Sequence, residues 1–330
     1  MREIHRSWST DPAVRHKAAA GGTLTALGRY LLDSGRVEAV LHVRADNRKP
    51  WLTTSTISRT SDEVLGGAQS RYGPSAPLVN VHRLLDEGTR FAVIAKPCDI
   101  SAIRALARID SRVDRLVPYM LTIFCGGVPN AHIAKAIMRH HGVDEQDVEL
   151  FRWRGEGWPG PLRVGTRDGA IYDMTYEDAW RGKKYGYGIQ FRCKICPDAV
   201  GEVADISATD GWTLRDGKPI YEEAPGTNAT IVRTRAGEEL LHAAIAVGCL
   251  DVSPASIEEI EQMHVKNHPH RKLGASAALF ALRLMGQRAI RAPGYRTADA
   301  LKRAGLRTLF RQFAGTIGRV KAGENREHLI

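Results

Sequence analysis

The chain has 330 residues, of which 43% are hydrophobic and 25% are charged. These proportions are those of a folded globular protein and argue against a disordered chain. No apolar run approaches the roughly 20 residues that a membrane-spanning helix needs, and the charged N-terminus lacks the apolar core of a secretory signal. We therefore expect a cytoplasmic protein without a membrane span.

Basic residues outnumber acidic ones, with 47 Lys and Arg against 37 Asp and Glu. Much of this excess lies between Arg271 and Lys321, where Asp299 is the sole acidic residue. Such a charge favours an acidic partner: nucleic acid, an anionic membrane surface, a phosphate-bearing cofactor or an acidic carrier protein. Because the sequence has no recognised nucleic-acid-binding motif and no interleaved aromatic residues, we expect no nucleic-acid partner.

Helices and strands alternate along the first half of the chain. In order, the apolar pattern predicts a helix at 23–34, a strand at 37–43, a helix at 81–88, a strand at 91–95, a turn at 96–99, a helix at 100–109, a strand at 116–124 and a helix at 131–141. This alternation is typical of an α/β core with a mixed or parallel sheet.

Beyond residue 147 the character of the sequence changes. Glycines and tryptophans separate short strand-like pieces from Val148 to about Tyr176, which predicts a β-hairpin insertion. Strands and a helix are expected between residues 204 and 246, and a helical, amphipathic tail from His264 onward. We therefore expect a mixed sheet with flanking helices, divided into an α/β region (1–147), a β-rich region (148–263) and a basic helical tail (264–330).

Four of the five cysteines fall where a metal site is expected. Cys98 and Cys125 each follow a predicted buried strand, and Cys193 and Cys196 form a Cys-x-x-Cys pair before Pro197. Loops at the carboxyl ends of strands are where α/β proteins place ligands, and a Cys-x-x-Cys pair supplies two thiolates to one site. We predict one metal site from these four. Spacing alone leaves open an iron–sulfur cluster, a zinc site or unrelated thiols.

The neighbours of these cysteines carry further expectations. Lys96, Arg192 and Lys194 are basic and are expected to lower the pKa of the thiols. Cys249 lies in an apolar run and is interpreted as a core residue, whereas His264 lies in a polar turn and is expected to be solvated.

Two glycine-containing loops are candidates for binding phosphate. Gly21, Gly22 and Thr23 bring backbone amides and a hydroxyl to the start of a predicted helix, although neither a dinucleotide fingerprint nor a P-loop is present. The loop 66–75 contains Ser70, Arg71 and Tyr72, a composition that suits phosphate binding and ring stacking or a simple connection.

Several segments together resemble the coenzyme F420 hydrogenase/dehydrogenase beta-subunit family. They occur in family order between residues 18 and 241 and are AAAGGTLTALGRYLLDSGRVEAVL, SRYGPS, AVIAKPCDISAIRAL, LTIFCGGVP, FRCKICPDAVGEVADISATDGW and PGTNATIVRTRAGEELL. The resemblance implies a flavoprotein that holds FAD beside a [4Fe–4S] cluster, and it favours iron–sulfur over zinc. With five cysteines in all, a second four-cysteine cluster does not fit in the chain.

Carried onto this sequence, the resemblance implies cluster ligands and flavin contacts. The cluster ligands would be Cys98, Cys125, Cys193 and Cys196. The flavin-lining candidates are Gly21, Gly22, Thr23, Ser70, Arg71, Tyr72, Lys96, Asn228, Arg233 and Thr234. The first region would then bind the flavin and the second the cluster.

The implied activity is that of an iron–sulfur flavoprotein oxidoreductase that reduces an organic substrate. The electron donor would be acidic, either reduced ferredoxin or coenzyme F420, and Lys183, Tyr185 and Tyr72 are candidate proton donors. The alternative is an electron-transfer subunit of a larger hydrogenase or dehydrogenase complex, and a homo-oligomer also stays open. A remote alternative, suggested by the pI near 9.5, is a zinc-bearing nucleic-acid-binding protein.

Overall fold

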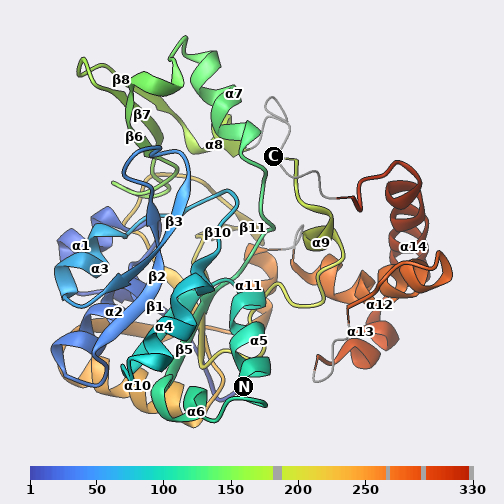
Figure 1. Cartoon of the computed structure of the whole chain (residues 1–330), viewed down its shortest axis with the longest axis horizontal. Helices are drawn as coiled ribbons and strands as arrows, with labels where there is room; N and C mark the ends of the chain where they lie inside the picture. The colour runs from blue at the N-terminus through green and yellow to red at the C-terminus, as the bar shows by residue number, and fades with distance from the viewer. Residues whose placement is uncertain (181–187, 265–267, 291–294, 327–330) are drawn as a thin grey trace.

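The computed structural model describes residues 1–180, 188–264, 268–290 and 295–326 (Figure 1). At its centre is an eight-stranded sheet in the order β13-β1-β12-β9-β5-β4-β2-β3. The strands are β1 (Glu3–Ser9), β2 (Ala39–Ala45), β3 (Thr53–Ser58), β4 (Phe91–Ala95), β5 (Tyr119–Ile123), β9 (Ile206–Asp210), β12 (Asn228–Val232) and β13 (Leu250–Pro254). Strands β2, β4, β5 and β9 are parallel, and antiparallel strands flank them on both sides. The expected mixed α/β fold is confirmed.

Helices cover both faces of this sheet. Successive residues of a strand point to opposite faces, and in β5 neighbouring apolar residues pack on each of them. Leu121 of β5 packs with α2 (Thr23–Asp33) and α10 (Arg235–Ala246) on one face. Met120 packs on the other face with α4 (Val81–Asp86), α5 (Pro97–Leu106) and α6 (Arg112–Leu116). Two further short helices are α1 (Pro12–Lys17) and α3 (Ser61–Gly66).

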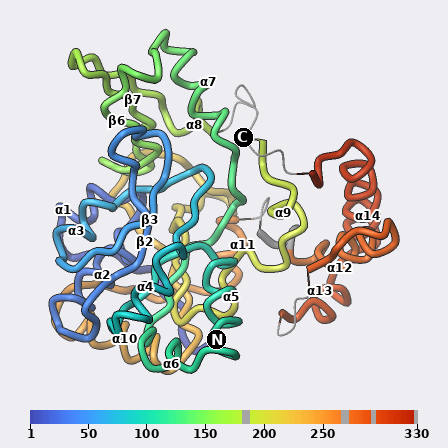
Figure 2. The backbone as a smooth tube through the Cα atoms, viewed as in Figure 1, coloured from blue at the N-terminus to red at the C-terminus, as the bar shows by residue number. Residues whose placement is uncertain are grey.

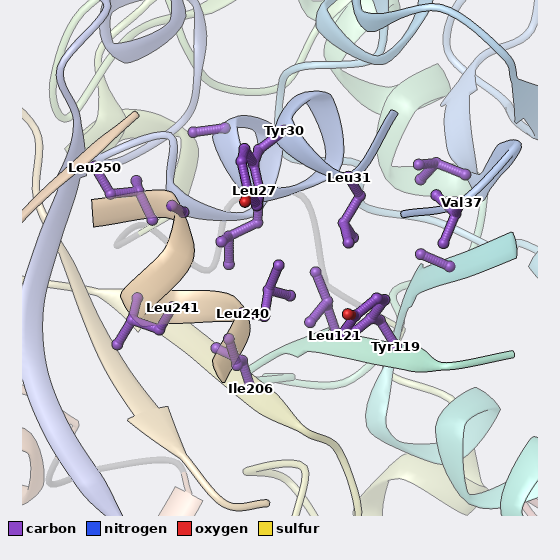
Figure 3. Close-up of a cluster of buried hydrophobic side chains, with 14 of the residues drawn as sticks. Leu27, Tyr30, Leu31, Val37, Tyr119, Leu121, Ile206, Leu240, Leu241 and Leu250 are labelled. Carbon is purple, nitrogen blue, oxygen red and sulfur yellow. The ribbon is translucent and has the colours of Figure 1, made fainter. Parts of the chain in front are cut away.

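Helix α2 forms because its apolar residues recur at helical spacing and meet the sheet. Leu27 and Leu31, one turn apart, are fully buried, and Figure 3 shows them meeting Leu240 of α10 and Ile206 of β9. Full burial of such a leucine contributes about 1.5–3 kcal/mol relative to exposure. The core therefore fixes where the first turn of α2 lies.

The predicted β-rich insertion forms its own small sheet. Strands β6 (Val148–Arg152), β7 (Leu162–Thr166) and β8 (Ile171–Met174) are antiparallel, so the expected hairpin has a third strand. Helices α7 (His132–His140) and α8 (Tyr176–Trp180) pack on it through a shared apolar cluster. The short pair β10 (Leu214–Arg215) and β11 (Lys218–Pro219) lies apart from it in sequence.

The C-terminal part is helical, as expected. Helix α11 (Ile257–Met263) is followed by α12 (His268–Leu284), α13 (Thr297–Arg303) and α14 (Leu306–Lys321). Figure 2 shows α12, α13 and α14 as a group at the right of the molecule, whereas α11 lies nearer its middle. None of the helices in the described ranges is long and apolar enough to cross a membrane.

Two local expectations need correction. Cys98 was expected in a turn, but α5 begins at Pro97, whose fixed φ suits the first helical position, so Cys98 lies in the first turn of this helix. The N-terminal residues were given no structure, yet they form β1, which lies between β12 and β13.

Candidate functional site

The candidate site residues gather along one edge of the central sheet. Strands β4, β5 and β9 are parallel, so their carboxyl ends lie at the same edge. Lys96 and Cys98 follow β4, Cys125 follows β5, and Asp210 ends β9. Asn228 pairs with Asp210 in the register of β12 and therefore lies at this edge too. Such an edge is where open α/β sheets bind ligands.

The start of α2 is joined to this edge through Asn228. The Asn228 side chain accepts a hydrogen bond from the Thr23 backbone N–H (3.1 Å) and donates one to the Thr209 carbonyl (3.0 Å). Gly22 has a φ of +78°, which favours glycine, and a side chain on Gly21 would meet the Ser7 carbonyl and the Asn228 backbone. Residues 205 positions apart thus form one helix N-terminus.

The hydroxyl of Thr23, a residue predicted to contact the flavin, is hydrogen-bonded inside the protein. Thr23 is fully buried, and its hydroxyl hydrogen-bonds the Ser7 hydroxyl at 2.7 Å, which in turn bonds the Thr230 hydroxyl. The first turn of α2 therefore offers backbone N–H groups and the positive end of the helix dipole, without this hydroxyl.

Arg71 stabilises its own loop, residues 66–75, through hydrogen bonds inside the protein. Its guanidinium donates to the carbonyls of Pro50, Leu52 and Phe151, as well as to the side chains of Thr53 and Gln69. Burial lowers the pKa of Arg71 to about 10, and the nearby charge of Arg152 adds to that effect. Because guanidinium has five N–H donors and these five acceptors engage them, Arg71 has a structural role in the present arrangement.

Lys96 connects the same loop to α5. Its ammonium lies 2.8 Å from the Asp99 carboxylate and donates to the Ser75 hydroxyl at 2.8 Å. The loop that contains Ser70 is thereby held beside Cys98, and Ser70 itself is partly buried.

Of the candidate proton donors Tyr72, Lys183 and Tyr185, Tyr72 lies within the described residues and the other two lie outside them. The Tyr72 ring packs against Trp153 and Trp180, with centroids 5.8 and 4.3 Å away. Its hydroxyl lies 3.5 Å from Arg154. A fixed cation therefore lies next to this hydroxyl.

Arg154 itself was not predicted as a site residue. Its side chain is 2% exposed, pairs with Asp210 at 2.8 Å and lies over the ring of Tyr176 at 4.9 Å. Burial alone would lower the pKa of Arg154, but the Asp210 carboxylate outweighs it and the net shift is upward. The pair ties the insertion to the ligand-binding edge. The sequence signal was weak: an Arg between two tryptophans.

Three cysteine-bearing segments meet at this edge. The Cys125 backbone N–H donates to the Ala199 carbonyl (2.8 Å), and the Val128 N–H donates to the Cys193 sulfur (3.4 Å). The thiolates of Cys125 and Cys196 also lie near enough to raise the pKa of Cys98. Cys125 and Cys193 act in the same way on Cys196. The fold therefore brings the segments that carry the four predicted ligands to the same edge of the sheet, although they span 99 positions of the sequence (98 to 196).

The expected lowering of the thiol pKa values is wrong for two of these cysteines. Burial, the largest cause, raises the pKa of Cys98 to about 12 and that of Cys196 to about 11. Cys98 keeps an exposed surface, where water lessens the rise. Lys96 opposes the shift at Cys98 but is outweighed by burial and by the negative charge of Asp99, which itself raises the pKa of Cys98.

The donor set suits a cluster. In the part of the chain that the structure describes, no three His, Cys, Asp or Glu side chains gather closely enough to hold one metal ion. A [4Fe–4S] cluster needs less convergence, because each thiolate binds a different iron. The four cysteine sulfurs that bind such a cluster lie farther apart than those of a tetrahedral zinc site, whose Zn–S bond length implies a sulfur–sulfur distance of about 3.8 Å. Four cysteines on segments that reach one edge of the sheet are compatible with this wider spacing.

The other candidates at β12 are separated by the length of the strand. Thr234 caps α10 and bonds Asp205, at the opposite edge from Asn228 and about 20 Å away along the strand at about 3.3 Å per residue. Arg233 bonds the Val200 carbonyl and the Ser207 hydroxyl, and thus supports the loop that follows Cys196. The structure does not bring these two residues to the start of α2.

The structure contradicts the expectation for His264 and agrees with the expectation for Cys249. His264, expected to be solvated, contacts the Thr209 hydroxyl at 2.8 Å and lies 5.8 Å from the Phe124 ring, so that expectation is wrong. The turn that holds it folds back onto β9, and burial lowers the pKa of its imidazole. Cys249 is partly buried and packs against the apolar cluster that contains Leu27 and Leu240, as expected for a core residue.

Two family models match the chain, and both describe the beta subunit of coenzyme F420 hydrogenase/dehydrogenase. The model of its N-terminal part matches residues 4–83, and the model of its C-terminal part matches residues 88–258. The second match includes all four candidate cluster cysteines. The helices of the C-terminal tail lie outside both matches.

Individual relatives agree with these matches. The chain is 29% identical over 241 residues to the F420-dependent formate dehydrogenase 1 subunit beta of Methanococcus maripaludis, covering 72% of this chain and 58% of that one. It is 26% identical over 272 residues to the coenzyme F420 hydrogenase subunit beta of Methanothermobacter thermautotrophicus, covering 79% and 86%. The chain thus spans little more than half of the first relative.

The fold also matches a solved structure. A chain of the F420-reducing [NiFe] hydrogenase complex from Methanosarcina barkeri superposes with a TM-score of 0.62 at 22% identity, covering 88% of this chain and 96% of that one. At this identity the similarity shows the fold alone.

Proposed function

The chain belongs to the coenzyme F420 hydrogenase/dehydrogenase beta-subunit family, and we propose that it is an electron-transfer subunit that holds one [4Fe–4S] cluster and one FAD. The observation that carries this proposal is the meeting of three cysteine-bearing segments at the sheet edge where α2 begins. Two relatives are named as beta subunits of F420-dependent enzymes. These names support the subunit alternative better than an independent reductase.

The cluster and FAD would each bind at a different part of this edge of the central sheet. Cys98, Cys125, Cys193 and Cys196 would hold the cluster. The first turn of α2 would bind a phosphate of FAD through backbone N–H groups, with Asn228 fixing its position. A bound flavin exchanges single electrons with a cluster and hydride with an organic carrier. Arg71 would hold the loop 66–75 in place rather than bind phosphate, since protein acceptors engage its donors.

The carrier we propose is coenzyme F420, whose acidic tail suits a chain with a net charge of +10. Tyr72, beside Arg154, is a proton donor candidate within the described residues. Lys183 and Tyr185 stay candidates from the sequence. A larger complex would supply or accept the electrons that pass through the cluster.

Anaerobic titration of the purified chain with reduced coenzyme F420 tests this function. The flavin absorbance should bleach first and the broad cluster absorbance next. Cys193→Ser should keep the flavin bleaching and lose the cluster absorbance, and Cys249→Ser should behave as the parent chain. If reduced ferredoxin bleaches the absorbance and reduced F420 does not, ferredoxin is the carrier in place of F420. A colourless protein that binds zinc would overturn the proposal.

Isolation under mild conditions tests the subunit role. Stoichiometric co-purification with a catalytic subunit is the expected result. Full turnover of an organic substrate by the isolated chain would instead restore the independent reductase.

A further inference from the structure

The C-terminal tail contacts α5, which carries Cys98, and the segment that carries Cys193 and Cys196. Figure 1 shows α9 (Phe191–Lys194), which contains Cys193, lying between the central sheet and the group formed by α12 and α14. Neither family model extends past residue 258, so the two matches give this tail no role.

Apolar contacts join the tail to the Cys-x-x-Cys segment. Phe191 and Ile195 are buried in one cluster with Leu279 and Leu282 of α12, and Val320 of α14 packs against it. Phe191 and Ile195 flank Cys193 in sequence, so the backbone that positions its thiol rests on the tail. Burial of these apolar side chains stabilises the contact between α9 and the tail.

The first polar contact fixes the helix that carries Cys98. Ser101 lies three residues after Cys98 on α5, and its hydroxyl hydrogen-bonds the Tyr295 hydroxyl of the tail. Tyr295 therefore joins the tail directly to the helix that carries Cys98.

Two ion pairs join the tail to residues in and just after the Cys-x-x-Cys pair. Lys194, inside the Cys-x-x-Cys motif, pairs with Glu324 at 2.6 Å. Glu202, in the loop after Cys196, pairs with Lys272 of α12, and the two side chains are 23% and 19% exposed. Pairs with this degree of burial contribute more than fully exposed ones. Lys272 also lies 5.3 Å from the ring of Tyr295, so the contacts form one connected set.

We infer that the described part of the tail, residues 268–290 and 295–326, forms a brace that fixes α5 and the Cys-x-x-Cys segment relative to one another and shields their thiols from solvent on the side of the tail. The purpose of this brace rests on the proposed function, because it would retain the cluster. Its contacts do not depend on a cluster, so they can be tested separately.

Charge reversal at Lys272 tests the brace in the full-length chain. Lys272→Glu should repel Glu202, open the tail and expose Cys196. We expect iron loss to a chelator about tenfold faster, with a parallel rise in the rate at which iodoacetamide labels Cys193 and Cys196. The double variant Lys272→Glu/Glu202→Lys restores the opposite charges and should return both rates toward those of the parent chain. Lys302→Glu, an exposed position on α13, is the matched control.

A second variant avoids any change of charge. Tyr295→Phe removes the hydrogen bond to Ser101 and should speed labelling of Cys98 with an unchanged melting temperature. Unchanged labelling in both Lys272→Glu and Tyr295→Phe would overturn the brace. A chain that never binds iron, but in which both variants label faster, would overturn the proposed function and leave the brace standing.

Discussion

Arg154 of the insertion and Asp210 at the end of β9 form an ion pair of 2.8 Å in which the arginine side chain is 2% exposed. The guanidinium also donates to the Ala19 carbonyl just before the Gly21–Gly22 turn. Indole and phenol rings of Trp158, Tyr176 and Trp212 surround it. The pair therefore joins three parts of the chain at the proposed flavin site.

Removal of this cation should be costly. Arg154→Met would leave Asp210 without its buried partner, and we expect a loss of about 3–5 kcal/mol in the free energy of unfolding. Urea denaturation of the purified chain measures it. Arg215→Met breaks an ion pair whose side chains are 64% and 61% exposed, so it should cost under about 1 kcal/mol. Equal losses in both variants would contradict a structural role for the buried pair.

Asn228 is expected to act on α2 and, through it, on flavin retention. Asn228→Ala removes the side-chain oxygen that accepts from Thr23, which should cost about 1 kcal/mol of stability and lower the FAD content. FAD released per chain is the readout. Ser256→Ala removes a similar cap from α11 and should cost about the same in stability with no effect on FAD. A shared loss of FAD would show that general destabilisation is the cause.

His42 should make stability depend on pH. Burial lowers the pKa of its imidazole to about 4, and Ser58 hydrogen-bonds it at 2.7 Å. In the unfolded chain the pKa is about 6.5, so between these values the unfolded state binds more protons. The contribution, roughly 3 kcal/mol, is therefore complete above about pH 6.5 and is lost as the pH falls toward 4.

Urea denaturation at pH 7.5 and pH 5 checks the role of His42. The parent chain should lose more stability between these pH values than His42→Gln does. The same slope in both chains would assign the pH dependence to other groups.

The sequence predicts those elements whose apolar pattern is regular. The strand Phe91–Ala95 is confirmed at its predicted bounds, and the helix at 23–34 ends within a residue of α2. Strand β1 was missed because its buried Ser7 is polar and is satisfied by Thr23 and Thr230, partners that only the fold supplies. Local pattern carries no information on such long-range pairing.

The candidate site was predictable to a similar extent. Cys98 and Cys125 follow strands, so their position at one edge follows from a parallel sheet. Arg154 and the tail contact of Tyr295 were not foreseen, because each depends on how separate units pack. The involvement of Arg71 with backbone carbonyls likewise becomes visible once the chain is folded.

The central claim is that Cys98, Cys125, Cys193 and Cys196 hold one [4Fe–4S] cluster. Iron and acid-labile sulfide, measured per chain in anaerobically purified protein, test it most directly. We predict about four of each in the parent chain and in Cys249→Ser. Serine at any of the four proposed ligands should cause a large loss of both. Stoichiometric zinc without iron, or full iron content in Cys193→Ser, would contradict the claim.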